Sequence, residues 1–256
     1  MCLEKINHWF ATRLIPWLTG SAKAPHVYIS DAFYLNWYQL GKSIQQTKKS
    51  AKGVCIDVGA GCAPYYSMLV DEVDEYIITD YVPTHTSMFK DDKRSFVEAD
   101  ILNLPFKENY ADTVLLTQVL EHVVDPHKAL DEVRRVLKED GILMISVPFI
   151  YQAHALPHDY WRFSEYGLRH LLERYDFEIL EFHYQGYIGT TLMSIFNGFL
   201  WDASSRNKSF RNLVLLPFLL LIFSINNMIG RILDLYKSPS FSPNFFVLCR
   251  LQKEFR

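Results

Sequence analysis

Three aspartates, Asp57, Asp80 and Asp100, each lie in or directly after a short apolar run. Runs of this kind predict buried strands of a parallel sheet. The carboxyl ends of parallel strands meet at one edge of the sheet, and such folds bind nucleotide-like ligands there. A carboxylate at this edge can accept two hydrogen bonds from a ribose diol. We assign that role to Asp80, which follows Gly61 by 19 residues.

The first of these runs, 54–58, is followed by a turn that carries Gly59 and Gly61. Glycine tolerates positive φ and lets a ligand approach the backbone without meeting a Cβ atom. A dinucleotide fingerprint would need a further glycine where Pro64 stands, and the chain has no Gly-Lys-Ser/Thr of a P-loop. The turn therefore disfavours a nicotinamide dehydrogenase and excludes a P-loop enzyme.

The pattern Asp57-x-Gly59-x-Gly61-x-Ala63 resembles motif I of the class I S-adenosylmethionine-dependent methyltransferases, with alanine in place of the third glycine. The stretch 98–106 resembles the third motif of that family. The stretch 118–126, with its Leu-Glu-His-Val and Asp-Pro, resembles a loop of the type-11 methyltransferases. The resemblance implies an α/β fold with a doubly wound, Rossmann-like sheet of seven mostly parallel strands and helices on both faces.

The resemblance also implies S-adenosylmethionine as the cofactor. In the family, the acid at the position of Asp80 binds the ribose, Asp100 accepts from the adenine amino group and Ile101 packs on the ring. The residues assigned to the cofactor are Asp57, Gly59, Ala60, Gly61, Asp80, Tyr81, Asp100, Ile101 and Gln118. A tight turn after a buried strand, with no cofactor, is the alternative for the glycine pattern alone. The order of the three acids argues against it.

The segment 154–164 concentrates a base, an acid, a cation and aromatic side chains after the predicted fifth strand. A loop in that position can overhang the methyl group of the cofactor. A hydroxyl acceptor must lose a proton, and His158 is the candidate general base, with His122 as second choice. Acceptor binding is assigned to Asp159, Tyr160 and Arg162. In the alternative, His158 and Asp159 only hold the loop in place through hydrogen bonds.

The chain divides into four expected segments. These are N-terminal helices that cover the cofactor site (1–50), the S-adenosylmethionine-binding core (51–185), an apolar helical insertion (186–243) and the final strand (244–256). The run Leu213–Phe223 lies in the insertion and includes Pro217, and the longer stretch to Gly230 is interrupted by this proline and by two asparagines. Eleven helical residues span only about 17 Å of a hydrocarbon core of about 30 Å. We therefore expect a hairpin lying in the cytoplasmic leaflet, with a helical lid or a dimer contact as the alternative.

Charge is unevenly distributed along the chain. The net charge of −3 argues against general nucleic-acid binding. Residues 1–53 carry seven Lys or Arg against two Asp or Glu, and residues 201–256 carry eight against three. Basic ends that are also apolar, including an amphipathic helix expected at 3–18, favour contact with an anionic membrane surface.

The four cysteines show no spacing typical of a metal site, so we expect no metal and a reduced, cytoplasmic setting. The expected function is O-methylation of a small or lipid-linked acceptor, such as a glycan or a quinone precursor. The alternative is a membrane-associated S-adenosylmethionine-binding or scaffold protein without turnover.

Overall fold

The computed structural model describes residues 28–81, 94–204 and 215–252 of the chain. These residues fall into two compact units. The core unit contains the described residues of 42–149, 153–183 and 244–256, and the helical unit contains those of 1–41, 150–152 and 184–243. The amphipathic helix expected at 3–18 and the basic residues 206–211 lie outside the described residues.

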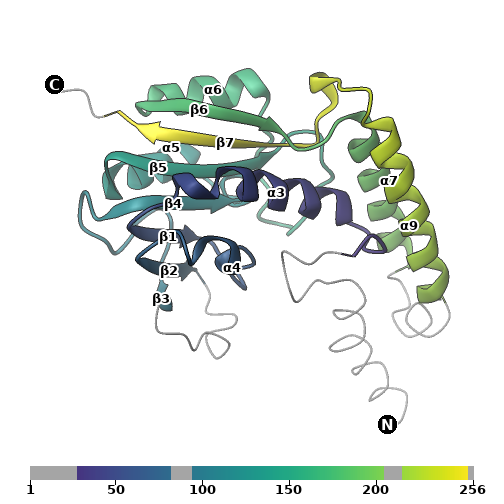
Figure 1. Cartoon of the computed structure of the whole chain (residues 1–256), viewed down its shortest axis with the longest axis horizontal. Helices are drawn as coiled ribbons and strands as arrows, with labels where there is room; N and C mark the ends of the chain where they lie inside the picture. The colour runs from purple at the N-terminus through teal and green to yellow at the C-terminus, as the bar shows by residue number, and fades with distance from the viewer. Residues whose placement is uncertain (1–27, 82–93, 205–214, 253–256) are drawn as a thin grey trace, which may run out of the picture. The chain divides into compact units, whose positions relative to one another are not determined.

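The core unit is built on a seven-stranded sheet with the strand order β3-β2-β1-β4-β5-β7-β6 (Figure 1). The strands are β1 (Val54–Val58), β2 (Glu75–Asp80), β3 (Arg94–Glu98), β4 (Ala111–Thr117), β5 (Leu137–Pro148), β6 (Phe177–Tyr184) and β7 (Asn244–Leu251). Strands β1 to β5 pair in parallel, and β7 runs antiparallel to β5. The predicted mostly parallel, doubly wound sheet is confirmed, and its last strand follows the apolar helical segment as expected.

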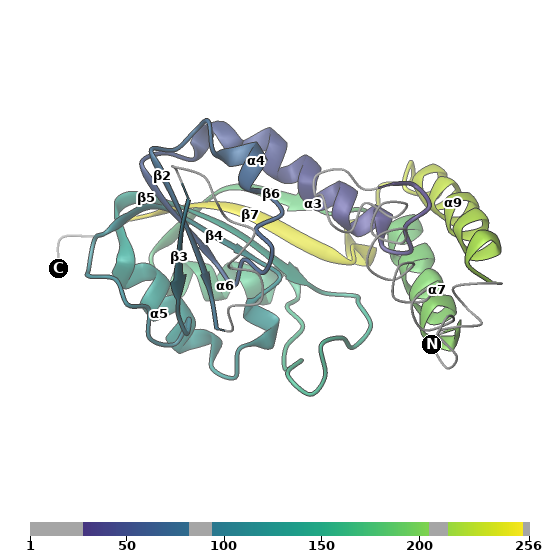
Figure 2. The same ribbon diagram turned by 90° about the horizontal axis from the view of Figure 1, so that it is seen from below.

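Helices cover both faces of this sheet. Figure 2 shows α4 (Tyr66–Leu69) on one face and α5 (Pro126–Val136) and α6 (Glu165–Arg174) on the other. The predicted cap of α6 is present, because the side chain of Ser164 accepts a hydrogen bond from the amide of Gly167 at 3.2 Å. Helix α5 ends at Val136, because Leu137 already pairs with β4.

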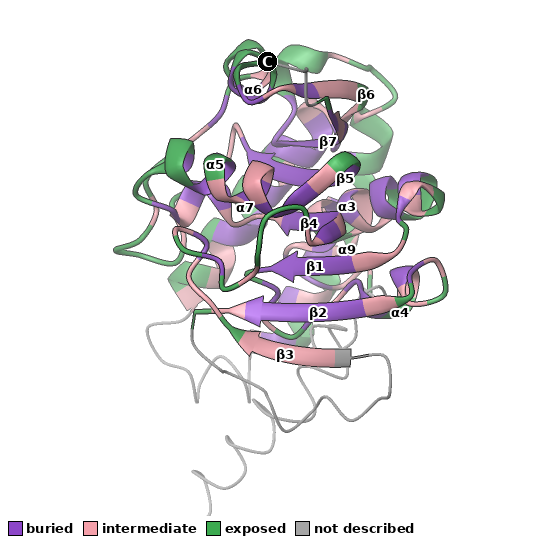
Figure 3. Ribbon diagram, turned by 90° about the vertical axis from the view of Figure 1, so that its left-hand side faces the viewer, coloured by how far each residue is buried: buried purple, intermediate pink, exposed green. Residues whose placement is uncertain are grey.

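The central strands carry the hydrophobic core, as their apolar runs predict. Ile56 of β1, Ile78 of β2 and Ile145 of β5 are fully buried, whereas the edge strand β3 is only half-buried (Figure 3). Cys55 and Cys249 are free, buried thiols inside strands, as expected. Because these strands are buried on both faces of the sheet, polar side chains can reach a ligand at the carboxyl ends of the strands.

The helical unit contains α7 (Ile188–Ser204), α9 (Leu216–Leu233) and the short 3₁₀ helix η6 (Pro239–Phe241). The helix α3 (Tyr34–Thr47) begins in this unit, and its last six residues belong to the core unit. Helices α7 and α9 lie side by side (Figures 1 and 2). A Cβ atom on Gly189 would lie 2.1 Å from the carbonyl oxygen of Gly230, so this crossing requires glycine.

Asparagines join the two helices of this hairpin. The Asn197 side chain donates to Oδ1 of Asn227 at 3.1 Å, and Asn226 donates to Oδ1 of Asn197 at 2.8 Å. Asn227 also donates to the carbonyl oxygen of Asp31 at 2.8 Å. The two asparagines interrupt the apolar sequence but not the helix, because α9 continues through both and uses them as its polar contacts. Pro217 lies in the first turn of α9, where proline is tolerated.

One side of α9 is buried and the other is exposed and apolar. Its buried residues are Leu216, Leu219, Phe223, Asn227 and Gly230. The large exposed side chains are Phe218, Leu221, Ile222, Ile225, Met228, Ile229, Ile232 and Leu233. Within the described residues, α9 is the one helix whose length and apolar composition would allow it to cross a membrane.

Candidate cofactor site and acceptor loop

A cleft of about 490 Å³ opens at the carboxyl ends of the parallel strands of the core unit. Its wall is formed by the ends of β1 and β2, by residues 99–102 after β3, and by residues 119–124 after β4. His158 and Tyr160 line it from the segment after β5. The topology thus brings together residues that are up to 102 positions apart in the sequence, from Val58 to Tyr160.

Five of the nine residues assigned to the cofactor line this cleft: Gly59, Asp80, Tyr81, Asp100 and Ile101. The structure places the other four, Asp57, Ala60, Gly61 and Gln118, outside its wall. Both candidate bases, His122 and His158, line the cleft, and so does one of the three residues assigned to the acceptor, Tyr160.

The glycine turn has the conformation that its sequence predicts. Gly59 has φ 65° and Gly61 has φ 55°. A Cβ atom on Gly59 would lie 2.6 Å from Cγ2 of Val119, so a larger residue could not pack there. Ala63, which stands where the family has its third glycine, also has a positive φ of 48°. An alanine in this region costs about 1 kcal/mol, so the departure from the family pattern is tolerated at a cost.

The amide of Gly61 holds a side chain of the cleft in place, although Gly61 itself does not line the cleft. It donates a hydrogen bond to Oδ2 of Asp80 at 2.9 Å, and the amide of Ala60 donates to the carbonyl oxygen of Thr79 at 3.0 Å. These bonds fasten the glycine turn to the end of β2. Gly61 and Ala60 therefore position Asp80 although they do not line the cleft.

Asp57 lies inside the sheet. Its side chain is 1% exposed, and its Oδ2 accepts a hydrogen bond from the Tyr76 hydroxyl at 2.6 Å. Burial raises the pKa of Asp57 to about 7, although the bond from Tyr76 partly opposes this shift. The structure therefore gives Asp57 a role beneath the glycine turn, at a position from which its carboxylate does not reach the cleft.

Asp100 and Gln118, which we also assigned to the cofactor, hold the backbone of the site in place. Oδ1 of Asp100 accepts from the amide of Leu102 at 2.8 Å and so holds the turn after β3. Gln118 has a φ of 54°, and its side-chain amide donates to Oγ of Ser146 at 3.1 Å. Gln118 therefore fastens the end of β4 to β5, while Asp100 lines the cleft.

The segment after β5, which we call the acceptor loop (residues 153–163), is fastened to the 3₁₀ helix η4 (Leu120–His122). The amides of Tyr160 and Trp161 donate to the carbonyl oxygen of Glu121 at 2.9 and 3.2 Å. Nδ1 of His158 lies 3.1 Å from the Tyr160 hydroxyl. The loop thus presents His158 and Tyr160 to the cleft as a hydrogen-bonded pair.

Asp159 and Arg162 pair with each other. The two guanidinium nitrogens of Arg162 donate to the two carboxylate oxygens of Asp159, both at 2.7 Å. This pairing holds the pKa of Asp159 at about 2, and the carboxylate also accepts from the amide of His154 at 2.9 Å. Neither residue lines the cleft. For Asp159, the geometry favours the alternative in which it holds the loop in place.

Glu121 is the site residue that the sequence analysis missed. Its side chain is fully buried, and neither carboxylate oxygen has a hydrogen-bond partner among the described residues. Burial raises the pKa of Glu121 to about 8. Its neighbour His122 has Nδ1 2.6 Å from the carbonyl oxygen of His158. Glu121 and His122 stand between Val119-Leu120 and Val123 in the sequence, and a carboxylate in this otherwise apolar stretch was the available signal.

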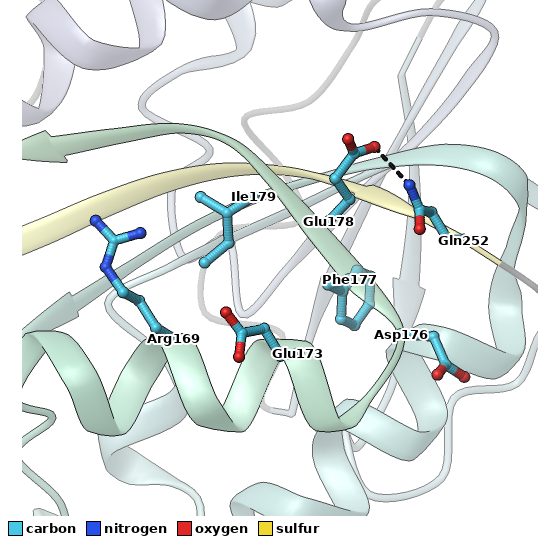
Figure 4. Close-up of a pocket in the computed structure, with 7 residues that line it drawn as sticks. All are labelled: Arg169, Glu173, Asp176, Phe177, Glu178, Ile179 and Gln252. Carbon is cyan, nitrogen blue, oxygen red and sulfur yellow. Dashed lines mark hydrogen bonds between the residues drawn. The ribbon is translucent and has the colours of Figure 1, made fainter.

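A second groove of the core unit lies between α6 and β6 (Figure 4). Three of its charged side chains are already paired. Gln252 donates to Glu178 at 2.8 Å, Arg169 bonds Glu165 at 3.0 Å, and Arg134 pairs with Asp176. These pairs leave the groove a weaker candidate for a functional site than the cleft at the strand ends.

Comparison with known proteins identifies this arrangement. Residues 56–145 match a family model described as a methyltransferase domain, Methyltransf_11. The uncharacterised protein MJ0638 of Methanocaldococcus jannaschii is 40% identical over 92 residues, which is 36% of this chain and 39% of that protein. The ubiquinone/menaquinone biosynthesis C-methyltransferase UbiE of Vibrio cholerae is 30% identical over 101 residues, which is 35% of this chain and 39% of that protein.

Among solved structures, the complex between the Haloferax volcanii Trm112 methyltransferase activator and a putative methyltransferase contains a similar chain. It has a TM-score of 0.60 at 14% identity, with 96% of this chain and 97% of that chain covered. The matches to the two curated relatives span less than half of the length of each. Residues 56–145 thus form a methyltransferase domain of the type-11 kind, and they lie within a sheet whose fold is shared with solved methyltransferases.

Proposed function

We propose that this protein transfers the methyl group of S-adenosylmethionine to a hydroxylated, lipid-soluble ring of the quinone-precursor class. The observation that carries the proposal is the shared cleft. Asp80 and Asp100, the acids assigned to the ribose and the adenine, line the same cavity as His158. One cavity therefore offers both the groups for the cofactor and a base for an acceptor.

The cofactor would use the strand-end side of the cleft. A carboxylate held by the amide of Gly61 is suited to a ribose diol, because its second oxygen and remaining lone pairs can accept two further hydrogen bonds. By the family resemblance, Asp100 accepts from the adenine amino group and Ile101 packs on the ring. Gly59 allows the amino-acid end of the cofactor to approach the backbone closely.

Methyl transfer does not require the protein to form a covalent bond with the substrate. The methyl group on a sulfonium is already electrophilic, so alignment of the acceptor and exclusion of water supply most of the rate. A phenolic hydroxyl becomes a strong nucleophile when His158 takes its proton. If Nδ1 of His158 carries the hydrogen and donates to the Tyr160 hydroxyl, Nε2 is the nitrogen that accepts this proton. The methyl group then forms its bond to oxygen, and S-adenosylhomocysteine leaves.

Deprotonation of a phenol also activates the ring carbons beside the oxygen. The relative from Vibrio cholerae is named as a C-methyltransferase of ubiquinone and menaquinone biosynthesis, which supports a quinone-like ring more than a glycan. The same base serves either atom, since attack by carbon is followed by loss of the ring proton. Our expectation from the sequence is transfer to oxygen, and the product assay below distinguishes the two.

A lipid-soluble acceptor agrees with the exposed side of α9. Within α9, the one charged residue is Arg231, and the exposed residues before it are almost all apolar. Exposed apolar surface of this extent is typical of contacts with membranes or partner proteins. We propose that it inserts into an anionic cytoplasmic leaflet, with Arg231 and Lys237 meeting lipid phosphates at about 1 kcal/mol each.

The length argument against a membrane span weakens with the structure, because α9 has 18 residues where eleven were considered. At 1.5 Å per residue it reaches about 27 Å. It remains a peripheral element in our proposal because one side of it is buried against protein, with Asn227 and Gly230 on that side.

The proposal is tested by incubating the protein with methyl-labelled S-adenosylmethionine and a demethylated polyprenyl phenol in mixed micelles. We expect S-adenosylhomocysteine and labelled lipid in equal amounts, and mass spectrometry of the product separates O-methyl from C-methyl. If the protein binds the cofactor but yields no S-adenosylhomocysteine with such phenols or with extracted membrane lipids, it is a binding or scaffold protein without turnover.

A further inference from the structure

Three side chains converge next to the cleft in a way that methyl transfer does not require. Glu121, His122 and His154 each present one donor atom, and these atoms all lie within 4.8 Å of one another. Nε2 of His122 and Nε2 of His154 both lie 3.8 Å from Oε1 of Glu121. Their rings are 4.7 Å apart and nearly perpendicular, at 77°. Two imidazoles and a carboxylate thus face a common point.

Each imidazole has its other nitrogen next to an oxygen acceptor. Nδ1 of His122 bonds the carbonyl oxygen of His158 at 2.6 Å, which fixes the hydrogen on Nδ1 and leaves a lone pair on Nε2. Nδ1 of His154 lies 3.6 Å from Oδ2 of Asp159, whose carboxylate is held by Arg162. Histidines that bind metals almost always donate their second nitrogen to a carbonyl or a carboxylate. His122 does so, whereas His154 lies just beyond hydrogen-bond distance of the Asp159 carboxylate.

Glu121 supplies the strongest reason for a cation. Its side chain is fully buried, and both of its oxygens lack a hydrogen-bond partner among the described residues. A buried carboxylate that no other residue hydrogen-bonds is unfavourable, and buried charges are ordinarily paired or bound to metals. A proton on Glu121 or on one of the imidazoles could neutralise the carboxylate, whereas a metal ion would satisfy all three side chains at once.

We propose that Glu121, His122 and His154 bind a divalent first-row transition-metal ion such as Zn²⁺ or Fe²⁺. Two imidazole nitrogens and one carboxylate oxygen suit these ions better than Mg²⁺ or Ca²⁺, which prefer oxygen ligands alone. Ligand atoms bound at about 2.1 Å in tetrahedral geometry lie about 3.4 Å apart. Each imidazole nitrogen would therefore move about 0.4 Å closer to Glu121, and donor atoms that are up to 4.8 Å apart would approach one another by up to about 1.4 Å. Both rings are only partly buried, which leaves them room to move.

The proposed ion would lie at the wall of the cleft, because His122 lines it. This also gives His122 a different role from the second-choice base, since both of its ring nitrogens are engaged. Metal binding requires neither the cofactor nor an acceptor, so the inference stands apart from the proposed methyl transfer. It differs from our expectation of no metal, which rests on the spacing of cysteines, because all three ligands are histidine or glutamate.

The test uses the full chain, dialysed against a chelator and then against metal-free buffer. Zn²⁺ is titrated by calorimetry, and Co²⁺ binding is followed by its visible absorption. We expect one saturable ion per chain with nitrogen and oxygen ligands. Glu121→Gln and His154→Ala should each weaken binding at least tenfold. All measurements are made with Cys62→Ser, because Cys62 is an exposed thiol that could bind either ion.

His158→Ala is the matched control for metal binding. It removes an imidazole from the same cleft but keeps the backbone carbonyl that bonds His122, so its affinity for Zn²⁺ should remain within about twofold of the wild type. Thermal unfolding provides a second measurement, in which Zn²⁺ should raise the melting temperature of the wild type and leave that of a folded Glu121→Gln variant unchanged. The proposal is overturned if the wild type binds no ion, or if Glu121→Gln and His154→Ala bind it as tightly as the control.

Discussion

The amide of Gly61 donates a 2.9 Å hydrogen bond to Oδ2 of Asp80 and so joins the turn after β1 to the end of β2. The glycine therefore has two functions, because its positive φ shapes the turn and its amide orients the carboxylate that we assign to the ribose. A motif glycine that lies outside the wall of the cleft can thus still determine cofactor binding.

His158→Ala should lower turnover about 100-fold or more, because the acceptor hydroxyl would lose its general base. Binding of S-adenosylmethionine should persist, since His158 is not assigned to the cofactor. Stopped assays of S-adenosylhomocysteine together with calorimetric titration measure the two effects separately. Tyr160→Phe, which removes only the hydroxyl partner of Nδ1, should have a smaller effect. Near-normal turnover in His158→Ala would leave this residue a structural role only.

Asp57 should make the stability of the fold depend on pH. Its folded-state pKa, raised by burial to about 7, exceeds the ordinary value, so the folded protein retains a proton that the unfolded chain loses first. The stabilisation from this group is complete below about pH 4 and is lost as the pH rises to about 7. Between pH 5 and pH 8, the free energy of unfolding should fall by about 2 to 3 kcal/mol more in the wild type than in Asp57→Asn. Urea unfolding at both pH values measures this, and parallel pH profiles would contradict the assignment.

Gly189→Ala should destabilise the helical unit by at least about 2 kcal/mol, because the new methyl group would collide with the backbone of Gly230. Gly41→Ala is the matched control, since it is also a glycine within a helix but has no atom within 4 Å of the added Cβ. That change should be neutral or stabilising by up to about 1 kcal/mol. Chemical unfolding of both variants tests the crossing of α7 and α9, and equal effects would be inconsistent with it.

The double substitution Phe218→Ser and Leu221→Ser should weaken sedimentation with anionic phosphatidylglycerol vesicles. Both side chains are more than 60% exposed on α9, so their loss removes apolar surface from the membrane contact and leaves the buried side of the helix intact. Tyr166→Ser, on the equally exposed surface of α6, is the control and should sediment like the wild type. If the wild-type chain ignores such vesicles at low salt, the exposed side of α9 serves another contact, and gel filtration would then report whether that is a second copy of the chain.

Much of the core unit was predictable because its signals are local. An apolar run bounded by turn residues defines β1, and the apolar run 245–249 lies inside β7. Ser164 predicted the start of α6 through its capping side chain. The end of α5 was not predictable, because leucine suits a helix as well as a strand. Leu137 belongs to β5 because it pairs with Ala111 of β4.

The parts of the site that the sequence did not reveal depend on contacts between distant segments. Asp159 and Arg162 could equally face an acceptor or each other, and only the folded loop shows that they pair. His154 and Glu121 are 33 positions apart, and their approach requires that the acceptor loop fold back onto η4. The asparagines of α9 likewise resemble interruptions in a sequence, but they are contacts in a helix pair.

The most direct test of the cofactor assignment is calorimetric titration of S-adenosylmethionine into the wild type and into Asp80→Ala. The substitution removes a carboxylate that would accept two hydrogen bonds from the ribose, each contributing about 1.5 to 3 kcal/mol when the acceptor is charged. We predict one binding site in the wild type and at least a tenfold loss of affinity in a variant whose circular dichroism and melting curve show that it remains folded. Equal affinity of the wild type and of folded Asp80→Ala would contradict the proposed site.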